Sequence, residues 1–289
     1  MTEKSSPNDL PRLARRAADS HKGDFGRALV VGGSRGMSGA IAMAGMATLR
    51  GGAGLVKLAV PDVCLETVAS FEPSYMTLPL PCDRAGRIAA AAKESINELA
   101  PDFTCIACGP GLGRSDELTE LVAWMYRSLE QPVVFDADAL NALAAHARRL
   151  ADPAGPRIIT PHPGEFRRLI SDGKPALGEL PARAVELAAQ HKIIVVLKGH
   201  RTLITDGHRE ARNNTGNPGM ATGGSGDVLT GLITALVCQG LAPFEAAQLA
   251  VYIHGLAGDL AAEQVGQVSL IASDLLRYLP AAFLQLESA

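Results

Sequence analysis

The chain has 289 residues, 47% of them hydrophobic and 20% charged, which is typical of a globular protein with a large core. Its formal net charge is −3 and only 4% of its residues are aromatic, which argues against a basic surface or a base-stacking platform for nucleic acid. The first residues lack the apolar core of a signal peptide, and no uncharged run approaches membrane-spanning length. We therefore expect no nucleic-acid partner, no membrane partner and a cytoplasmic location.

Short apolar runs of β type alternate with helical runs along the whole chain. Strands are predicted at 27–33, 55–60, 75–80, 103–108, 132–135, 157–160, 193–197 and 202–205, and the longer helices at 40–50, 86–99, 115–129, 181–191, 228–237, 244–263 and 273–286. This alternation predicts an α/β fold with a mostly parallel sheet and helices on both faces. No repeat or linker divides it, so we expect one domain over 22–289 after a polar tail or short surface helix at 1–21.

The five cysteines include one pair at metal-binding spacing, Cys105 and Cys108. Both lie in an apolar run that reads as a strand, where side chains three positions apart point to opposite faces. One zinc ion or one disulfide is therefore not expected, and both are interpreted as small buried side chains. Free thiols agree with a cytosolic setting.

The first glycine turn follows a predicted strand at 32–39, where nucleotides often bind in α/β proteins. Its spacing is Gly-Gly-x-x-Gly-x-x-Gly, which departs from the dinucleotide fingerprint Gly-x-Gly-x-x-Gly. No acidic residue ends the second strand at the expected distance. The turn predicts close backbone approach to a ligand, without indicating a nicotinamide-binding Rossmann half.

Five glycines lie in the fifteen residues 217–231, and one carboxylate, Asp227, stands where they give way to an apolar helical run. The first amides of a helix lack partners and face the positive end of its dipole, which favours anions. Asp227 is either a cap of this helix or a proton acceptor beside a bound phosphate. Such a dense glycine cluster exceeds the needs of a cap, which favours the second reading. Gly226 is followed by Asp227 and not by Lys-Ser/Thr, so this is no P-loop.

Other polar residues follow predicted strands and could line the same crevice beyond the carboxyl edge of the sheet. Asp138 is as readily a helix N-cap as a ligand group, and Asp136 is interpreted as structural. His162 lies between two prolines, which suits either a pocket or an exposed loop. Lys198 opens a tight turn and could be solvated there.

Several segments together resemble the ADP-dependent NAD(P)H-hydrate dehydratases of the ribokinase-like superfamily. The most specific is Asn217-Pro-Gly-Met-Ala-Thr-Gly-Gly-Ser-Gly-Asp227, supported by Thr160-Pro-His-Pro-Gly-Glu165 and Lys198-Gly-His-Arg-Thr202. Weaker matches follow the same order, namely Lys22–Gly33, Gly51–Val56, Gly109–Gly113 and Asp136–Asn141. The similarity extends from about Lys22 to the C-terminus.

This resemblance implies a lyase that repairs hydrated nicotinamide cofactors. The S epimer of hydrated NADH or NADPH would lose water while ADP, with Mg²⁺, is cleaved to AMP and phosphate. The resemblance implies that Asp227 is the base and that Glu165 acts on magnesium through water. It assigns contacts to the hydrated cofactor to four residues, Ala40, Gly113, His162 and Asp227. It assigns contacts to the AMP part to Lys198, Gly199, His200, Arg201, Thr202 and Gly226, and an anion hole to Gly223, Gly224, Ser225 and Gly226.

The resemblance also implies a homo-oligomer, a tetramer, and a separate epimerase, because this chain has no room for the epimerase domain fused to many relatives. Two alternatives stay open. A ribokinase-like kinase that phosphorylates a small alcohol, such as a vitamin precursor, would use the same anion site and base. A nucleotide sensor without turnover would use the anion site alone. The sequence does not separate ADP from ATP, or NADPH hydrate from NADH hydrate.

Overall fold

A computed structural model describes residues 10–146, 150, 153–170 and 175–287. Its sheet has nine strands in the order β3-β2-β1-β4-β5-β6-β7-β8-β9. The strands are β1 (Arg27–Val31), β2 (Leu55–Pro61), β3 (Met76–Leu80), β4 (Cys105–Cys108), β5 (Val133–Phe135), β6 (Arg157–Ile159), β7 (Ile194–Leu197), β8 (Leu203–Thr205) and β9 (Glu210–Arg212). Strands β1 to β7 pair in parallel, and β8 and β9 run antiparallel at one edge.

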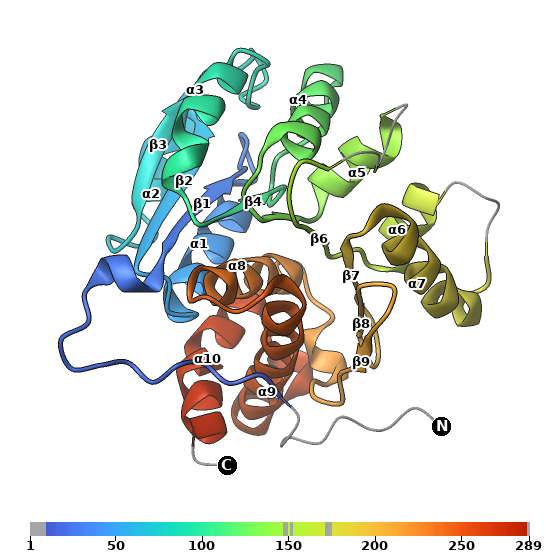
Figure 1. The fold of residues 1–289 in the computed structure, drawn as a ribbon. Helices are drawn as coiled ribbons and strands as arrows, with labels where there is room; N and C mark the ends of the chain where they lie inside the picture. Colours follow the sequence, from blue (N-terminus) through green and yellow to red (C-terminus); the bar gives the residue numbers. More distant parts are fainter. Residues whose placement is uncertain (1–9, 147–149, 151–152, 171–174, 288–289) are drawn as a thin grey trace.

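The helices form one layer on each face of the sheet (Figure 1). They are α1 (Ser38–Arg50), α2 (Leu65–Ala69), α3 (Ala92–Leu99), α4 (Asp116–Ser128), α5 (Asp138–Ala145), α6 (Pro163–Ile170), α7 (Leu180–His191), α8 (Ser225–Cys238), α9 (Pro243–Ser269) and α10 (Ala272–Glu287). Helices α1, α2, α8, α9 and α10 share one apolar core with the sheet, whereas α3 to α7 share the other. The predicted α/β fold with a mostly parallel sheet is confirmed.

Strand β1 shows why both faces of the sheet are covered. Ala28 and Val30 lie in the α8 and α9 core, and Leu29 and Val31 lie in the α3 to α7 core. All four are fully buried, as expected for a central parallel strand whose side chains alternate between two helix layers.

The cysteine prediction is confirmed by the same alternation in β4. Cys105 faces the core under α8, and Cys108 faces the core under α4 and α5. Both are free, and burial raises the pKa of Cys108 to about 12, so its thiol stays protonated.

Three differences from the predicted elements concern boundaries. The helix predicted over 86–99 begins at Ala92, because residues before it form turns and a bridge between Cys82 and Ile88. Helix α8 begins at Ser225, three residues before the apolar run, because its first residues, Ser225, Gly226 and Asp227, contribute no apolar pattern. The edge strand β9 is too short and polar to give a strand pattern.

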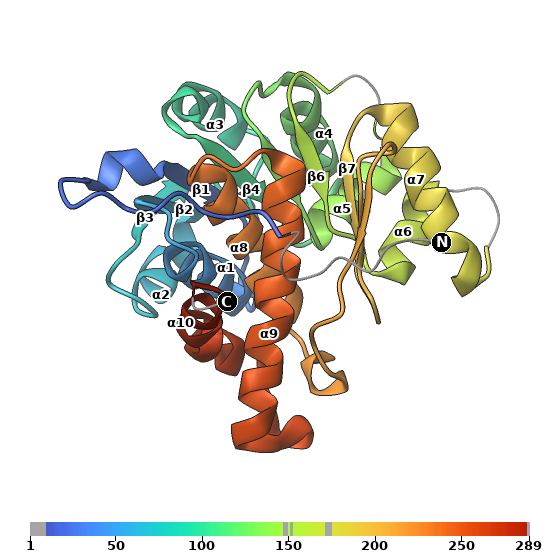
Figure 2. The same cartoon turned by 60° about the horizontal axis from the view of Figure 1, so that its bottom comes forward.

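The described part of the N-terminal tail lies along the surface of the body without a helix before Lys22 (Figure 2). Leu10 and Leu13 pack against the α8 and α9 core. Arg16 donates to the carbonyl of Gly52 at 2.9 Å and lies 3.8 Å from the centre of the Phe25 ring. Residues 1–9 of the predicted tail lie outside the described residues. In the described chain no helix has the length and apolar character needed to cross a membrane.

Candidate active site

Two charged side chains from different strand ends meet at the carboxyl edge of the sheet. Asp136 directly follows β5, and Lys198 directly follows β7, two strands away. The Lys198 Nζ lies 2.7 Å from the Asp136 Oδ1. The other oxygen, Oδ2, accepts a hydrogen bond of 2.8 Å from the Thr230 hydroxyl on α8. Asp136 is only 1% exposed, so these partners compensate a buried charge.

This geometry agrees with the structural interpretation of Asp136 and adds that its carboxylate positions Lys198. The carboxylate joins β5, β7 and α8, and it holds the Lys198 ammonium close to the start of α8. Lys198 is therefore paired, and the solvated alternative is wrong. Thr230 was missed because it lies inside an apolar helical run. Its position one turn after Gly226 and Asp227 is the signal that could have identified it.

The start of α8 leaves a narrow gap beside this ion pair. Gly224, the N-cap, has φ +95°, a conformation that favours glycine. A Cβ placed on Gly226 would lie 3.1 Å from the Lys198 Nζ and 3.4 Å from the Asp136 Oδ2. Glycine thus lets a ligand reach the helix amides and the ammonium together, as the predicted anion site requires.

Asp227, the third residue of α8, forms a charged cluster with Asp136, Lys198 and Glu165. Burial, followed by the nearby Asp136 carboxylate, raises the pKa of Asp227 from its ordinary 3.8 to about 7, although Lys198 acts in the opposite direction. A carboxylate that titrates near neutral pH can accept a proton during a reaction. A first-turn acid that only complements the helix dipole would not have a raised pKa.

His162 and Glu165 form reciprocal hydrogen bonds at the start of α6. The Glu165 Oε2 accepts from the His162 backbone N–H at 2.9 Å, and the His162 Nδ1 accepts from the Gly164 N–H at 3.0 Å. This resembles a capping box in which histidine replaces serine. Glu165 is 6% exposed, and burial raises its pKa while Lys198 lowers it. The His162 side chain is about half exposed.

A second pair of candidate residues meets at the start of α5. The Gly113 N–H, in the loop after β4, donates to the Asp138 Oδ2 at 3.0 Å. Asp138 is the first residue of α5, whose N-cap is Ala137, so the N-cap alternative for Asp138 is wrong. Ala137 has φ +51°, rare for a residue with a Cβ, and such strain clusters at functional sites. Ala40 lies in the first turn of α1, beside the Gly111 turn.

Five of the six residues assigned to the AMP part form the turn between β7 and β8, and the sixth, Gly226, lies in α8. The Thr202 hydroxyl donates to the Gly199 carbonyl at 3.1 Å and closes the turn. His200 and Arg201 project from it exposed, and Arg201 has φ +58°. Among the predicted residues, Asp227, Lys198 and Glu165 share this cluster and Gly226 lies beside it, whereas His200 and Arg201 are exposed in the turn.

Helix α9 contacts the glycine-rich segment 216–226 that leads into α8, and the sequence did not predict this contact. The Asp259 carboxylate accepts from the Gly216 N–H at 2.8 Å and from the Asn217 side-chain amide at 3.0 Å. Burial lowers the pKa of His254 to about 4, so its ring is neutral near pH 7, and its Nε2 lies 2.9 Å from the Ser225 carbonyl. That carbonyl only accepts, so Nε2 carries the hydrogen. The signal in the sequence was His254-Gly-Leu-Ala-Gly-Asp259, polar residues within an apolar helix.

Asp259→Ala is expected to lower the free energy of unfolding by about 1–3 kcal/mol, because two donors of the glycine loop lose their acceptor. ADP should also bind more weakly, since the loop that leads into α8 is no longer fixed. Urea unfolding and calorimetric titration with ADP measure the two effects. The matched control is Glu263→Ala, an exposed carboxylate one turn further along α9. Equal effects of both changes would contradict a specific role of Asp259.

Comparison with known proteins places the chain in a family. Residues 28–281 match the family model described as NAD(P)H-hydrate dehydratase. The chain belongs to this family. The bifunctional NAD(P)H-hydrate repair enzyme of Moorella thermoacetica is 45% identical over 282 residues, which are 96% of this chain and 52% of that protein. Its counterpart in Thermofilum pendens is 41% identical over 283 residues, 96% of this chain and 54% of that protein. The chain thus spans about half the length of these curated relatives.

Solved structures agree with this placement in the NAD(P)H-hydrate dehydratase family. The ADP/ATP-dependent NAD(P)H-hydrate dehydratase from Bacillus subtilis, co-crystallised with ATP/Mg²⁺, superposes with a TM-score of 0.83 at 30% identity over 97% of each chain. A ribokinase-like superfamily protein from Enterococcus faecalis gives 0.78 at 26% identity over 95% of this chain and 92% of that one. The ribokinase-like fold and the family resemblance predicted from sequence are therefore confirmed.

Proposed function

We propose that the site at the start of α8 dehydrates the S epimer of hydrated NADH and NADPH, using ADP and releasing AMP and phosphate. The observation that carries this proposal is the position of Asp227. Its carboxyl, with a pKa raised to about 7, lies in the first turn of a helix whose glycines and neighbouring Lys198 leave room for an anion. A base and a phosphoryl-binding site in contact suit activation of a hydroxyl by phosphoryl transfer.

The chemistry follows from the poor leaving ability of hydroxide. Asp227 accepts the proton of the ring hydroxyl as its oxygen attacks the β-phosphorus of ADP, and AMP leaves. The carbon–oxygen bond then breaks with the help of the ring nitrogen lone pair, the adjacent carbon loses a proton, and phosphate departs. The elements of water thus end in the phosphate. Amides of Gly223 to Gly226 and the Lys198 ammonium would stabilise the charge on the transferring group.

Magnesium fits this site as an ion carried by the nucleotide. Among the described residues no group of three or more His, Cys, Asp or Glu side chains could hold a metal. Mg²⁺ commonly binds substrate phosphates with one or two carboxylates and several waters. We propose that Glu165, close to Lys198 and Asp136 in the cluster, contacts such an ion through water. The free protein should then bind Mg²⁺ weakly compared with its ADP complex.

The remaining site assignments complete the proposal. The turn formed by Lys198, Gly199, His200, Arg201 and Thr202 would bind the AMP part together with Gly226. Ala40, Gly113 and His162 would contact the hydrated cofactor beside Asp227. An epimerase would act outside these 289 residues, and the protein would work in the cytoplasm as a homotetramer.

Gly226→Ala is expected to weaken ADP binding about tenfold, which corresponds to about 1.4 kcal/mol, with only a small change in stability. The added Cβ would occupy the gap beside the Lys198 Nζ, where the phosphoryl group is expected. Alanine favours a helix over glycine by roughly 0.5–1 kcal/mol, which offsets part of the cost of the close Cβ contact with Lys198, so the free energy of unfolding should change by less than about 1 kcal/mol. Titration calorimetry with ADP and urea unfolding measure both. Unchanged ADP affinity would place the phosphates elsewhere.

The proposed reaction is tested by the near-ultraviolet absorbance of reduced nicotinamide with NADH hydrate, ADP and Mg²⁺ supplied. We expect the absorbance to rise only when ADP is present. A phosphorylated small alcohol formed without any rise would favour the kinase alternative, and ADP binding without turnover of either compound would favour the sensor. ATP in place of ADP determines the nucleotide choice.

A further inference from the structure

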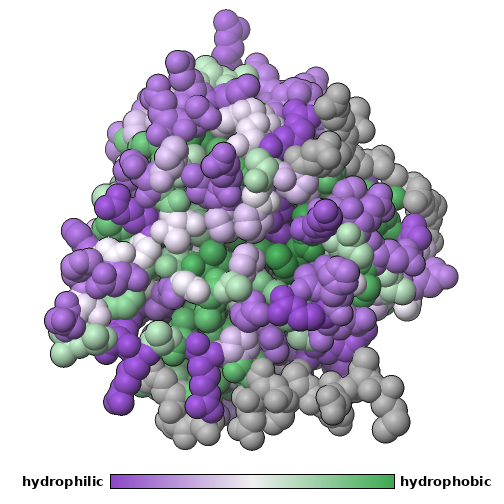
Figure 3. Space-filling view, in the orientation of Figure 1, coloured by the Kyte–Doolittle hydropathy of each residue, from purple (hydrophilic) through white to green (hydrophobic). Residues whose placement is uncertain are grey.

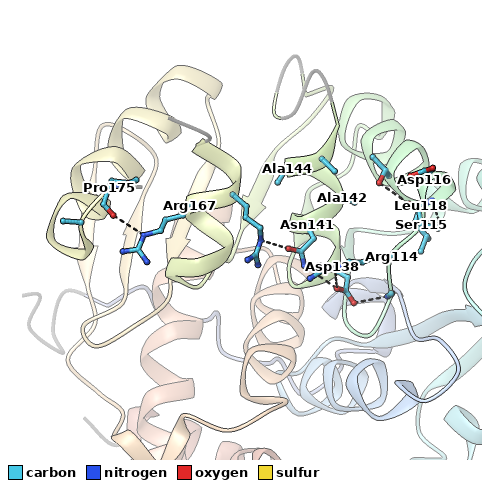
Figure 4. Close-up of a pocket in the computed structure, with 15 residues that line it drawn as sticks. Arg114, Ser115, Asp116, Leu118, Asp138, Asn141, Ala142, Ala144, Arg167 and Pro175 are labelled. Atoms are coloured by element: carbon cyan, nitrogen blue, oxygen red, sulfur yellow. Dashed lines mark hydrogen bonds and ion pairs between the residues drawn. The ribbon is translucent and has the colours of Figure 1, made fainter. Parts of the chain in front are cut away.

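The site at the start of α8 has an open side and a closed side. On the open side, Gly113 and Asp138 belong to the lining of a cavity of about 990 Å³ that α4, α5 and α6 also line (Figure 4). On the closed side, α9 packs beside α8 in the other apolar core (Figure 2). Side chains of α9 therefore reach the first turn of α8 from the layer opposite the cavity.

The first turn of α8 has no side-chain cap of its own. Its N-cap is Gly224, which has no side-chain oxygen to accept from the helix amides. The first bond of helical type runs from the Val228 N–H to the Gly224 carbonyl at 3.2 Å, so α8 offers no acceptor to the amides of Gly226 and Asp227. Glycines that admit an anion also leave the backbone free to move. The direction of these two amides has to be fixed by a contact from another element.

His254 of α9 supplies such a contact. Its Nε2 lies 2.9 Å from the carbonyl of Ser225, the first residue of α8, and 3.4 Å from the Ser225 hydroxyl. The shorter distance is the one to the carbonyl, so the Nε2–H donates there. Both residues are buried. The bond therefore holds the backbone directly before the two amides that α8 leaves open.

The surroundings of the His254 ring agree with this use. Burial lowers the pKa of His254 to about 4 against the effect of its bond to Ser225, and the nearby Lys198 ammonium lowers it further. The surface seen in Figure 1 has apolar atoms toward its middle and hydrophilic atoms around them (Figure 3). His254, only 9% exposed, contributes little to any surface, and a buried polar ring costs free energy unless it is hydrogen-bonded. The contact with Ser225 is what compensates this cost.

We propose that His254 is a positioning residue of the anion site: its Nε2–H holds the Ser225 carbonyl, fixes the first turn of α8 and so aims the next two amides at the β-phosphoryl group of ADP. The inference rests on the proposed function, in which that phosphoryl group lies at the start of α8. His254 touches neither nucleotide nor hydrate. It acts through the backbone of Ser225, and it replaces the cap that a glycine N-cap cannot provide.

The test compares His254→Gln with His254→Asn by titration calorimetry with ADP and with AMP, in the presence of Mg²⁺. Both replacements are uncharged amides, and only glutamine is long enough to place an N–H donor where Nε2 stands. AMP lacks the β-phosphoryl group and so reports on the rest of the nucleotide site. In His254→Asn we expect ADP to bind about tenfold more weakly and AMP within about twofold of wild type. His254→Gln should keep both affinities within about twofold of wild type.

Leu249→Ala, at a buried position of the same helix, is the matched control for general loosening. It should unfold at lower urea concentration than wild type and yet keep the wild-type ratio of ADP to AMP affinity. If asparagine prevents folding, His254→Leu replaces it with the same expectation, because leucine fills most of the volume of the ring without a donor.

Three results would overturn the inference: ADP affinity of the donor-free variant within about twofold of wild type, an equal loss in His254→Gln, or an equal loss in Leu249→Ala. These measurements do not depend on turnover. ADP binding that requires a donor at position 254, in a protein that forms no NADH from its hydrate, leaves the role of His254 standing while the proposed function fails. NADH formation by wild type, with ADP binding indifferent to position 254, gives the reverse.

Discussion

Asp227→Asn is expected to lower kcat for dehydration by roughly 10²–10⁴-fold, the usual contribution of a general base. Asparagine keeps the size of the side chain but cannot accept the proton of the ring hydroxyl. ADP should still bind, because the amides at the start of α8 and Lys198 are unchanged. Steady-state kinetics and calorimetric titration with ADP give the two quantities. Asp62→Asn, at an exposed position on the surface, is the matched control.

The same variant carries a second expected effect, on stability. Because the pKa of Asp227 is raised to about 7, the folded protein keeps a proton that the unfolded chain releases above 3.8. The contribution of Asp227 to the wild-type free energy of unfolding is therefore largest below about pH 4 and falls as pH rises toward 7. Above pH 7 it stays at its lowest value. At pH 8 the free energy of unfolding of Asp227→Asn should therefore exceed that of wild type by about 1–3 kcal/mol. Below pH 4 the two values should be equal. A less stable variant at pH 8, or full activity, would contradict the role of Asp227.

Lys198→Met is expected to lower the free energy of unfolding by about 3 kcal/mol and to abolish measurable ADP binding. It leaves the Asp136 carboxylate, 1% exposed, with the Thr230 hydroxyl as its remaining side-chain partner. Removing one partner of a buried ion pair is strongly destabilising because the other charge stays uncompensated. Urea unfolding measures this loss, and Lys192→Met, at an exposed lysine six residues upstream, is the matched control.

The double variant Asp136→Asn/Lys198→Met separates pairing from ligand binding. Asparagine carries no charge and can still accept from Thr230, so most of the lost stability should return. ADP binding should not return, since the ammonium is absent. If the double variant is as unstable as Lys198→Met alone, the pair does not account for the loss. If ADP binds normally to either variant, Lys198 is not a phosphate ligand.

The sheet and its helix layers follow from local patterns that sequence alone displays. Strand β1 is an apolar run that ends at two glycines. The glycines before Asp227 predicted the start of a helix and an anion site there. Such signals depend only on neighbours along the chain. They predicted the strand ends at which the site lies, and the family model confirmed the resemblance carried by the same segments.

The parts that sequence could not provide are contacts between distant segments. The partners of Asp136 could not be predicted because they are 62 and 94 positions away, directly after β7 and on α8. Asp259 and the Gly216 amide, 43 positions apart, meet only when α9 packs beside the glycine loop. The pKa of Asp227 likewise depends on burial and on Asp136, neither of which is visible in the run 217–231. Geometry of this kind arises from the fold and has no local pattern.

We propose that one site transfers a phosphoryl group from ADP to the hydrate and completes the elimination, with Asp227 as base. A single-turnover experiment with wild type, ADP, Mg²⁺ and NADH hydrate tests it most directly, following NADH, AMP and phosphate together at pH 6, 7 and 8. We expect equal amounts of the three products and a rate that falls as pH drops below the Asp227 pKa of about 7. NADH formed without AMP, AMP formed without NADH, or a rate that does not change between pH 8 and pH 6 would contradict it.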